Sequence, residues 1–184
     1  MTSFDHETTI SSSNEYYVAF IKLDGGPSTD ITEYLSESRN DIGCKLLNDT
    51  TLLRHPINSW CMSFRIDFSH IGYCIDNDGI WGYIPANDPS HLTALLVWCD
   101  YIRDKIVNTT PPIQTCIGVA RGDFCKSGNT VHCTVSGSGC AEARKLAGRC
   151  TNCTKQICLV IYRATLEEAK GLGSIKLPGY FLVI

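Results

Sequence analysis

The chain has 184 residues, of which 43% are hydrophobic and 19% are charged, and its formal net charge is −3. This size and composition fit one globular domain with a single hydrophobic core. The weak negative charge argues against a nucleic-acid-binding or membrane-adhering surface, and no apolar run reaches the roughly 18 residues that a membrane-spanning helix needs.

The first residues are polar and lack the apolar core of a signal peptide, so we expect a disordered leader at 1–14 and one domain at 15–184. The eleven cysteines are an odd number, and most lie within apolar stretches, where free cysteine packs as a small hydrophobe. We therefore expect reduced thiols and a cytoplasmic location.

The hydrophobic pattern predicts strands and helices in mixed order, which indicates an α/β (α+β) sheet with helices on one face. Two short strands around Asp76-Asn77-Asp78-Gly79 predict a hairpin, and Asp88-Pro89 is typical of a helix start. In chain order, we expect a strand at 16–23, a helix at 30–42, strands at 60–68, 70–75 and 80–84, a helix from 89 to 106, strands at 113–120 and 130–135, a helix at 140–149, a strand at 157–163, a short helix from 165 and a strand at 180–184.

Three segments, in this order, resemble the class III adenylyl and guanylyl cyclase domain. Residues 20–25 resemble the metal-binding strand of that family, and the hairpin at 75–80 lies where the family has a Gly-Asp-Gly turn. The most specific segment comprises 116–123 and 134–146. There the family has a strand ending in glycine, a second strand, another glycine, and a helix of small residues ending in Arg-Leu. The resemblance covers roughly residues 16–175.

This resemblance implies a ferredoxin-like, palm-type mixed sheet with helices packed on it. It also implies a homodimer with its sites at the subunit interface. Members of the family convert a nucleoside triphosphate into a 3′,5′-cyclic nucleotide and pyrophosphate. They use two Mg²⁺ or Mn²⁺ ions, held by two carboxylates, to stabilise the attacking and leaving oxygens.

The resemblance assigns metal binding to Asp78 in the hairpin turn, with its neighbour Asp76 as an assisting ligand. The first-strand carboxylate of the family falls at Lys22. Asp24 lies two residues further on and keeps the same side-chain direction in a strand, so it is the candidate replacement. Lys22 itself is a candidate for direct phosphate binding, or a lysine at the strand edge.

The base-reading positions of the family fall at Cys74 and Thr134, so the base preference stays open between purines and pyrimidines. The late-helix Asn and Arg of the family fall at Ala141 and Lys145, which share one helix face. Arg144 is adjacent. We expect Arg144 or Lys145 to stabilise charge at the transferred phosphorus.

Two alternatives remain open. Lys22, Ala141 and Lys145 together also suit a module that kept the fold and lost the reaction, and that binds a nucleotide or a partner. The sequence Lys-Leu-Asp-Gly-Gly after a strand also resembles CRISPR-polymerase and diguanylate cyclase palms, which form linked dinucleotides. Cys150 and Cys153 form a CxxC motif, but a structural zinc site commonly has two such pairs, so we expect no zinc.

Overall fold

The computed structural model describes seven stretches of the chain, namely 15–24, 70–76, 79–107, 114–129, 133–149, 159–169 and 181–184. The expected leader, the expected helix at 30–42, the expected strand at 60–68 and the CxxC motif lie outside the described residues.

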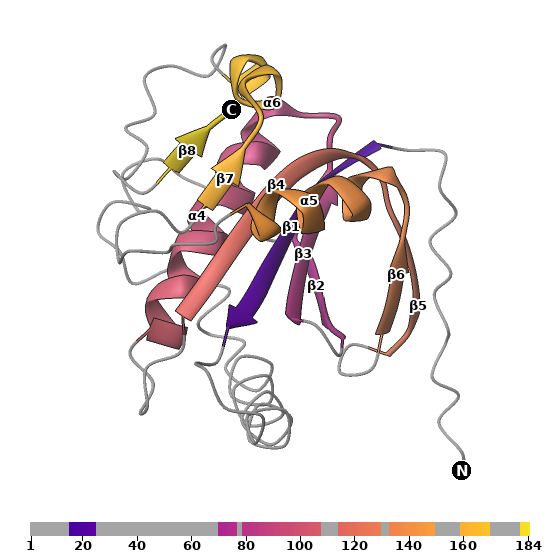
Figure 1. Cartoon of the computed structure of the whole chain (residues 1–184). Helices are drawn as coiled ribbons and strands as arrows, with labels where there is room; N and C mark the ends of the chain where they lie inside the picture. Colours follow the sequence, from indigo (N-terminus) through magenta and orange to yellow (C-terminus); the bar gives the residue numbers. More distant parts are fainter. Residues whose placement is uncertain are drawn as a thin grey trace.

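The described strands include one mixed sheet, as the sequence predicts, with six strands in the order β2-β3-β1-β4-β7-β8 (Figure 1). The first four pair antiparallel, and β4, β7 and β8 pair parallel. A separate antiparallel hairpin consists of β5 and β6. The strands are β1 (Glu15–Asp24), β2 (Gly72–Ile75), β3 (Gly79–Pro85), β4 (Gln114–Asp123), β5 (Cys125–Gly128), β6 (Cys133–Ser136), β7 (Leu159–Ile161) and β8 (Phe181–Val183).

Strand β1 lies in the middle of the sheet, between β3 and β4, and residues 16–21 are buried on both faces. Alternate side chains enter two separate cores: Tyr17, Ala19 and Ile21 belong to one cluster, and the residues between them belong to the other. A strand buried on both faces reads as a continuous apolar run, which explains the unbroken sequence YYVAFI.

Helices cover both faces of this sheet, so the expectation of helices on one face is wrong. Helix α4 (Pro89–Val107) packs behind the sheet, and α5 (Ser138–Gly148) packs in front of it (Figure 1). Helix α6 (Arg163–Ala169) contacts α4. The physical reason is β1: its second apolar face needs its own cover, which α5 supplies with Ala143 and Leu146.

Local signals explain where the helices begin and how closely they pack. The Asp88 carboxylate accepts a hydrogen bond from the Ser90 amide at 2.9 Å, which confirms it as the cap of α4 and lowers its pKa. Gly118 on β4 allows α5 to approach, because an added Cβ would lie 2.0 Å from the Ala143 carbonyl oxygen. Gly137, which precedes α5, has a left-handed φ of 116°.

Among the described helices, none combines the length and the apolar character that crossing a membrane requires.

Candidate functional site

The end of β1 lies beside the turn that joins β2 and β3. Lys22 is opposite Gly79 in the β1–β3 ladder, and Asp24 is the last residue of β1. Lys22 is partly buried, and strand alternation places it on the same sheet face as Phe20, the face that α5 covers. The side chain of Asp24 and all of Asp78 lie outside the described residues. The register therefore brings Lys22 next to the residue that follows Asp78 in the chain.

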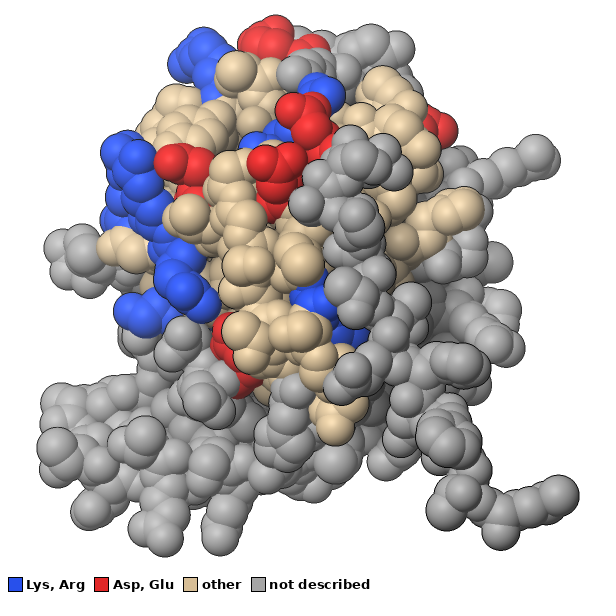
Figure 2. All heavy atoms as spheres, turned by 90° about the vertical axis from the view of Figure 1, so that its right-hand side faces the viewer, with Lys and Arg blue, Asp and Glu red and all other residues tan. Residues whose placement is uncertain are grey.

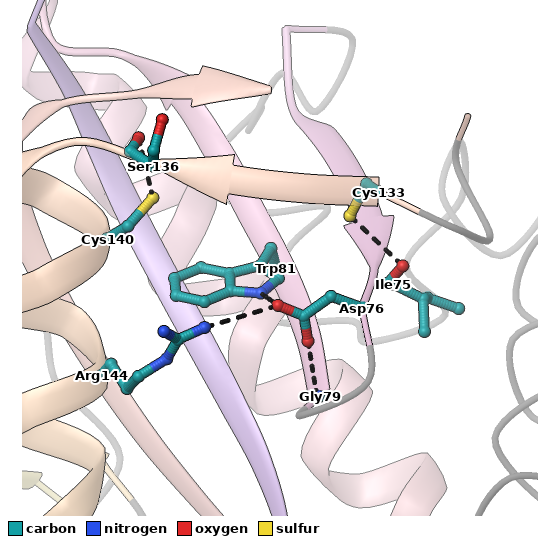
Figure 3. A network of polar contacts seen from close by, with 8 residues as sticks. All are labelled: Ile75, Asp76, Gly79, Trp81, Cys133, Ser136, Cys140 and Arg144. Atoms are coloured by element: carbon teal, nitrogen blue, oxygen red, sulfur yellow. Dashed lines mark hydrogen bonds and ion pairs between the residues drawn. The ribbon is translucent and has the colours of Figure 1, made fainter. Parts of the chain in front are cut away.

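The carboxylate of Asp76 holds this turn through contacts within its own chain (Figure 3). One oxygen accepts a hydrogen bond from the Gly79 amide at 2.9 Å, and the other accepts one from Trp81 Nε1 at 2.7 Å. The second oxygen also lies 3.5 Å from Arg144 Nη2. The side chain is only 12% exposed. Asp76 is therefore built into the turn as an acceptor.

The guanidinium of Arg144 reaches this turn from α5 (Figure 3). Its central carbon lies 5.2 Å from the ring centroid of Trp81 and 5.5 Å from that of Phe20. Cation–π attraction to two rings and the ion pair with Asp76 hold the guanidinium against the sheet. Half of the Arg144 side chain stays exposed, so the held cation remains open to an anion.

Lys145 points elsewhere, although it is the next residue of α5. Its ammonium lies 3.6 Å from Glu142 Oε2, and its side chain is 55% exposed. The Tyr162 hydroxyl also donates to Glu142 at 2.5 Å, and this bond lowers the pKa of the Glu142 carboxyl. Arg144, Lys145 and Arg149, which directly follows α5, are all exposed. Figure 2 shows Lys and Arg side chains gathered along the edge of the face on that side of the molecule.

The two predicted base-reading residues are not brought together. The Cys74 thiol is fully buried and hydrogen bonds with the thiol of Cys133 on β6. Thr134 is exposed, and alternation places it on the opposite face of β6 from Cys133. The sequence analysis did not single out Cys133. The alternation of Cys133 and Val135 with polar neighbours is the signal that points to it as an inward-facing residue.

The predicted transition-state position on α5, Ala141, is exposed and carries only a methyl group. Within the part of the chain that the structure describes, no group of three or more His, Cys, Asp or Glu side chains is arranged to hold a metal ion. The described side chains of the site therefore comprise its cations and Asp76 of the turn. The other two candidate metal-binding carboxylates, Asp24 and Asp78, are not among the described side chains.

No protein-family model matches the sequence, and no curated protein is significantly similar to it. Solved structures do match. The monomeric guanylyl cyclase domain of the RhoGC fusion protein from the aquatic fungus Blastocladiella emersonii is 18% identical, with a TM-score of 0.51, over 89% of this chain and 90% of that one.

Two further structures align with lower scores. The adenylyl cyclase CyaB from P. aeruginosa is 13% identical, with a TM-score of 0.49, over 93% of this chain and 91% of that one. The catalytic core of a rhodopsin-guanylyl cyclase with converted specificity, in complex with ATPαS, is 16% identical, with a TM-score of 0.48, over 92% and 93%. The match to the RhoGC guanylyl cyclase domain, together with the sheet order, shows that the chain has a mixed α+β, class III cyclase-like fold.

Proposed function

We propose that the chain is a divergent nucleotidyl cyclase domain, which works as a homodimer in the cytoplasm. It would convert a nucleoside triphosphate into a 3′,5′-cyclic nucleotide and pyrophosphate. One observation carries the proposal: the end of β1, the β2–β3 turn and Arg144 of α5 meet at one place on the sheet. The likeness in fold to a guanylyl cyclase domain supports it.

The chain's own cations suit a triphosphate. Lys22 and Arg144 lie on the same face of the sheet, and both can donate to phosphate oxygens. Asp76 and the two aromatic rings orient Arg144 before a nucleotide arrives, which reduces the entropy lost on binding. The exposed Lys145 aligns with the late-helix cation of the family. In a dimer, it would stabilise charge at the phosphorus from the partner subunit.

Divalent ions require hard oxygen donors, and the candidate carboxylates differ in how well they fit. Asp76 does not fit, because both of its oxygens accept hydrogen bonds within the turn and one faces Arg144. Asp24 and Asp78 are of the right donor type, and they would hold Mg²⁺ or Mn²⁺ at this end of the sheet. Held there, such ions would supply activation of the 3′-hydroxyl and charge stabilisation for the leaving pyrophosphate.

A module that binds a nucleotide without turning it over is the second candidate. Two observations favour it. Arg144 already forms an ion pair within its own chain, and Ala141 offers no hydrogen-bonding group where the family has Asn. Such a module would keep the nucleotide and the dimer but form no product.

An incubation with ATP, GTP, CTP and UTP in Mn²⁺, read by mass spectrometry, tests the proposal. We expect one cyclic mononucleotide, and its base names the specificity. Asp78→Ala abolishes the product, whereas Asp100→Ala, on α4 at the opposite face of the sheet from α5, leaves it unchanged. Linked dinucleotides would instead support the alternative of a CRISPR-polymerase or diguanylate cyclase palm. Bound nucleotide without any product would support the non-catalytic module.

A further inference from the structure

Two cysteine thiols meet where β2 lies beside the β5–β6 hairpin. Cys74 is on β2 and Cys133 is on β6, both side chains belong to the same buried cluster, and a hydrogen bond between them shifts both pKa values. Cys133 Sγ also donates to the carbonyl oxygen of Ile75 at 3.2 Å, across 58 residues of sequence (Figure 3). The Cys133 sulfur therefore reaches the backbone of the residue next to Cys74, and a disulfide requires the two sulfurs to close to about 2 Å.

The two thiols are not equivalent. Cys74 is completely buried, whereas Cys133 keeps 8% of its surface exposed, enough contact with solvent for a small oxidant. The hydrogen bond from Cys74 holds the pKa of the Cys133 thiol below its usual value, and the same bond, with burial, raises the pKa of Cys74. The nearby Lys126 ammonium favours the thiolate, while Asp76 opposes it. Cys133 is therefore the nucleophile of the pair.

We propose that Cys74 and Cys133 form a reversible intramolecular disulfide when the protein meets a peroxide. The Cys133 thiolate attacks one peroxide oxygen and breaks the O–O bond, which leaves a sulfenic acid on Cys133 and releases an alcohol or water. The Cys74 sulfur then attacks the Cys133 sulfur, and the hydroxyl group leaves as water with the Cys74 proton. Two thiols lose two electrons, and the peroxide gains them.

The neighbouring thiols do not compete equally for this reaction. Cys140 Sγ donates to the Ser136 carbonyl oxygen at 3.4 Å, and burial raises its pKa to about 12. A thiol with such a pKa is almost wholly protonated at neutral pH and reacts slowly. The structure therefore predicts one preferred pairing and not a mixture.

This disulfide would cross-link β2 to the β5–β6 hairpin and consume the thiol at the position that the class III resemblance gives to base reading. We expect oxidation to lower nucleotide turnover, and this consequence rests on the proposed function. The formation of the disulfide does not, because it is read from peptide masses. Failure of the disulfide and failure of the cyclase are thus separate results.

Peptide mapping tests the pairing. Reduced protein is treated with hydrogen peroxide, blocked with N-ethylmaleimide under denaturing conditions, and cut with trypsin and Asp-N. Cys74 is the single cysteine of peptide 67–75, and in a Cys140→Ser background Cys133 is the single cysteine of peptide 127–144. We expect these two peptides cross-linked, 2 Da below their summed mass, and separated again by dithiothreitol. A fully alkylated Cys74, or its pairing with any other cysteine, would overturn the proposal.

Two matched variants test the order of the steps. In Cys74→Ser, we expect Cys133 to stop at the sulfenic acid, which dimedone captures. In Cys133→Ser, we expect Cys74 to stay reduced, because it has no exposed surface and no activated partner. Cys74→Ala also removes the hydrogen bond that lowers the pKa of Cys133, so we expect the same sulfenic acid to form more slowly there, and Cys125→Ser is a control that keeps the disulfide. Oxidation of Cys74 in Cys133→Ser would contradict the assigned roles.

Discussion

Asp76 shows how one side chain serves both the fold and the candidate site. Its carboxylate accepts from the Gly79 amide and from the buried Trp81 indole, and it faces the guanidinium of Arg144. Without it, the Trp81 N–H would be buried with no acceptor, and such a group costs more than an average hydrogen bond contributes.

We therefore expect Asp76→Ala to lower the free energy of unfolding by about 1–3 kcal/mol, measured by urea denaturation. Glu15→Ala is the matched control: it removes a carboxylate that pairs with Arg121 across the β1–β4 ladder, with 55% of its side chain exposed. Because such surface pairs contribute little, this change should cost less than about 1 kcal/mol. Equal losses in the two variants would show that Asp76 does not hold the turn.

The cysteines predict a pH-dependent order of labelling. The pKa of Cys133 lies below its usual value because Cys74 donates to it, whereas burial raises the pKa of Cys140 to about 12. As the pH rises, the reactive thiolate therefore forms first at Cys133. With iodoacetamide at pH 8, we expect Cys133 to be labelled at least about tenfold faster than Cys140, followed by mass spectrometry over time. Faster labelling of Cys140 would contradict this order.

At the scale of elements, the close contact between β4 and α5 requires a residue without a side chain at position 118. In Gly118→Ala, the new Cβ would meet the Ala143 carbonyl oxygen at 2.0 Å, so the helix backbone has to move. We expect a loss of about 1–3 kcal/mol in the free energy of unfolding. Gly148→Ala, at the end of the same helix, has open space around it and should be neutral or stabilising by up to about 1 kcal/mol. Thermal and urea denaturation of both variants measure the difference.

The sequence predicted those elements whose signal is local. The hairpin of β2 and β3 has its turn residues, and α4 has its Asp88 cap and an apolar stripe. Strand β5 was not predicted, because Cys125-Lys126-Ser127-Gly128 is mostly polar and pairs only with β6. The sequence analysis also missed that helices cover both faces of the sheet, since this depends on which face each helix packs against.

The candidate site divides in the same way. The family resemblance and strand alternation were enough to single out Lys22, Arg144 and Asp76, because both depend only on the position of a residue along the chain. The contacts between them come from segments far apart in the sequence, so no local pattern could show that Arg144 lies on Trp81, or that Cys74 meets Cys133.

At the scale of the whole molecule, the proposed dimer makes a prediction that depends on the proposed function. Each site would take Asp78 from one subunit and Lys145 from the other. Asp78→Ala and Lys145→Ala should each be inactive alone. An equal mixture that exchanges subunits should recover roughly a quarter of the wild-type activity, because half of its dimers contain one intact site.

The product is measured by mass spectrometry after the two variants have been mixed and diluted to allow exchange. A mixture that stays inactive while sedimentation shows mixed dimers would mean that each subunit builds its site alone. A wild-type chain that is monomeric at the working concentration and still active would contradict the shared site directly.

The central position of β1 also has a consequence for synthesis of the chain. The ribosome makes this strand before either of its partners, and the Glu15–Arg121 ion pair at its edge spans 106 residues. Until β4 has left the exit tunnel, the apolar run from Tyr16 to Ile21 lacks a partner strand on one edge, and the face that α5 covers stays exposed until α5 follows β4. Translation therefore creates an interval in which this segment is a target for chaperones and a point of aggregation.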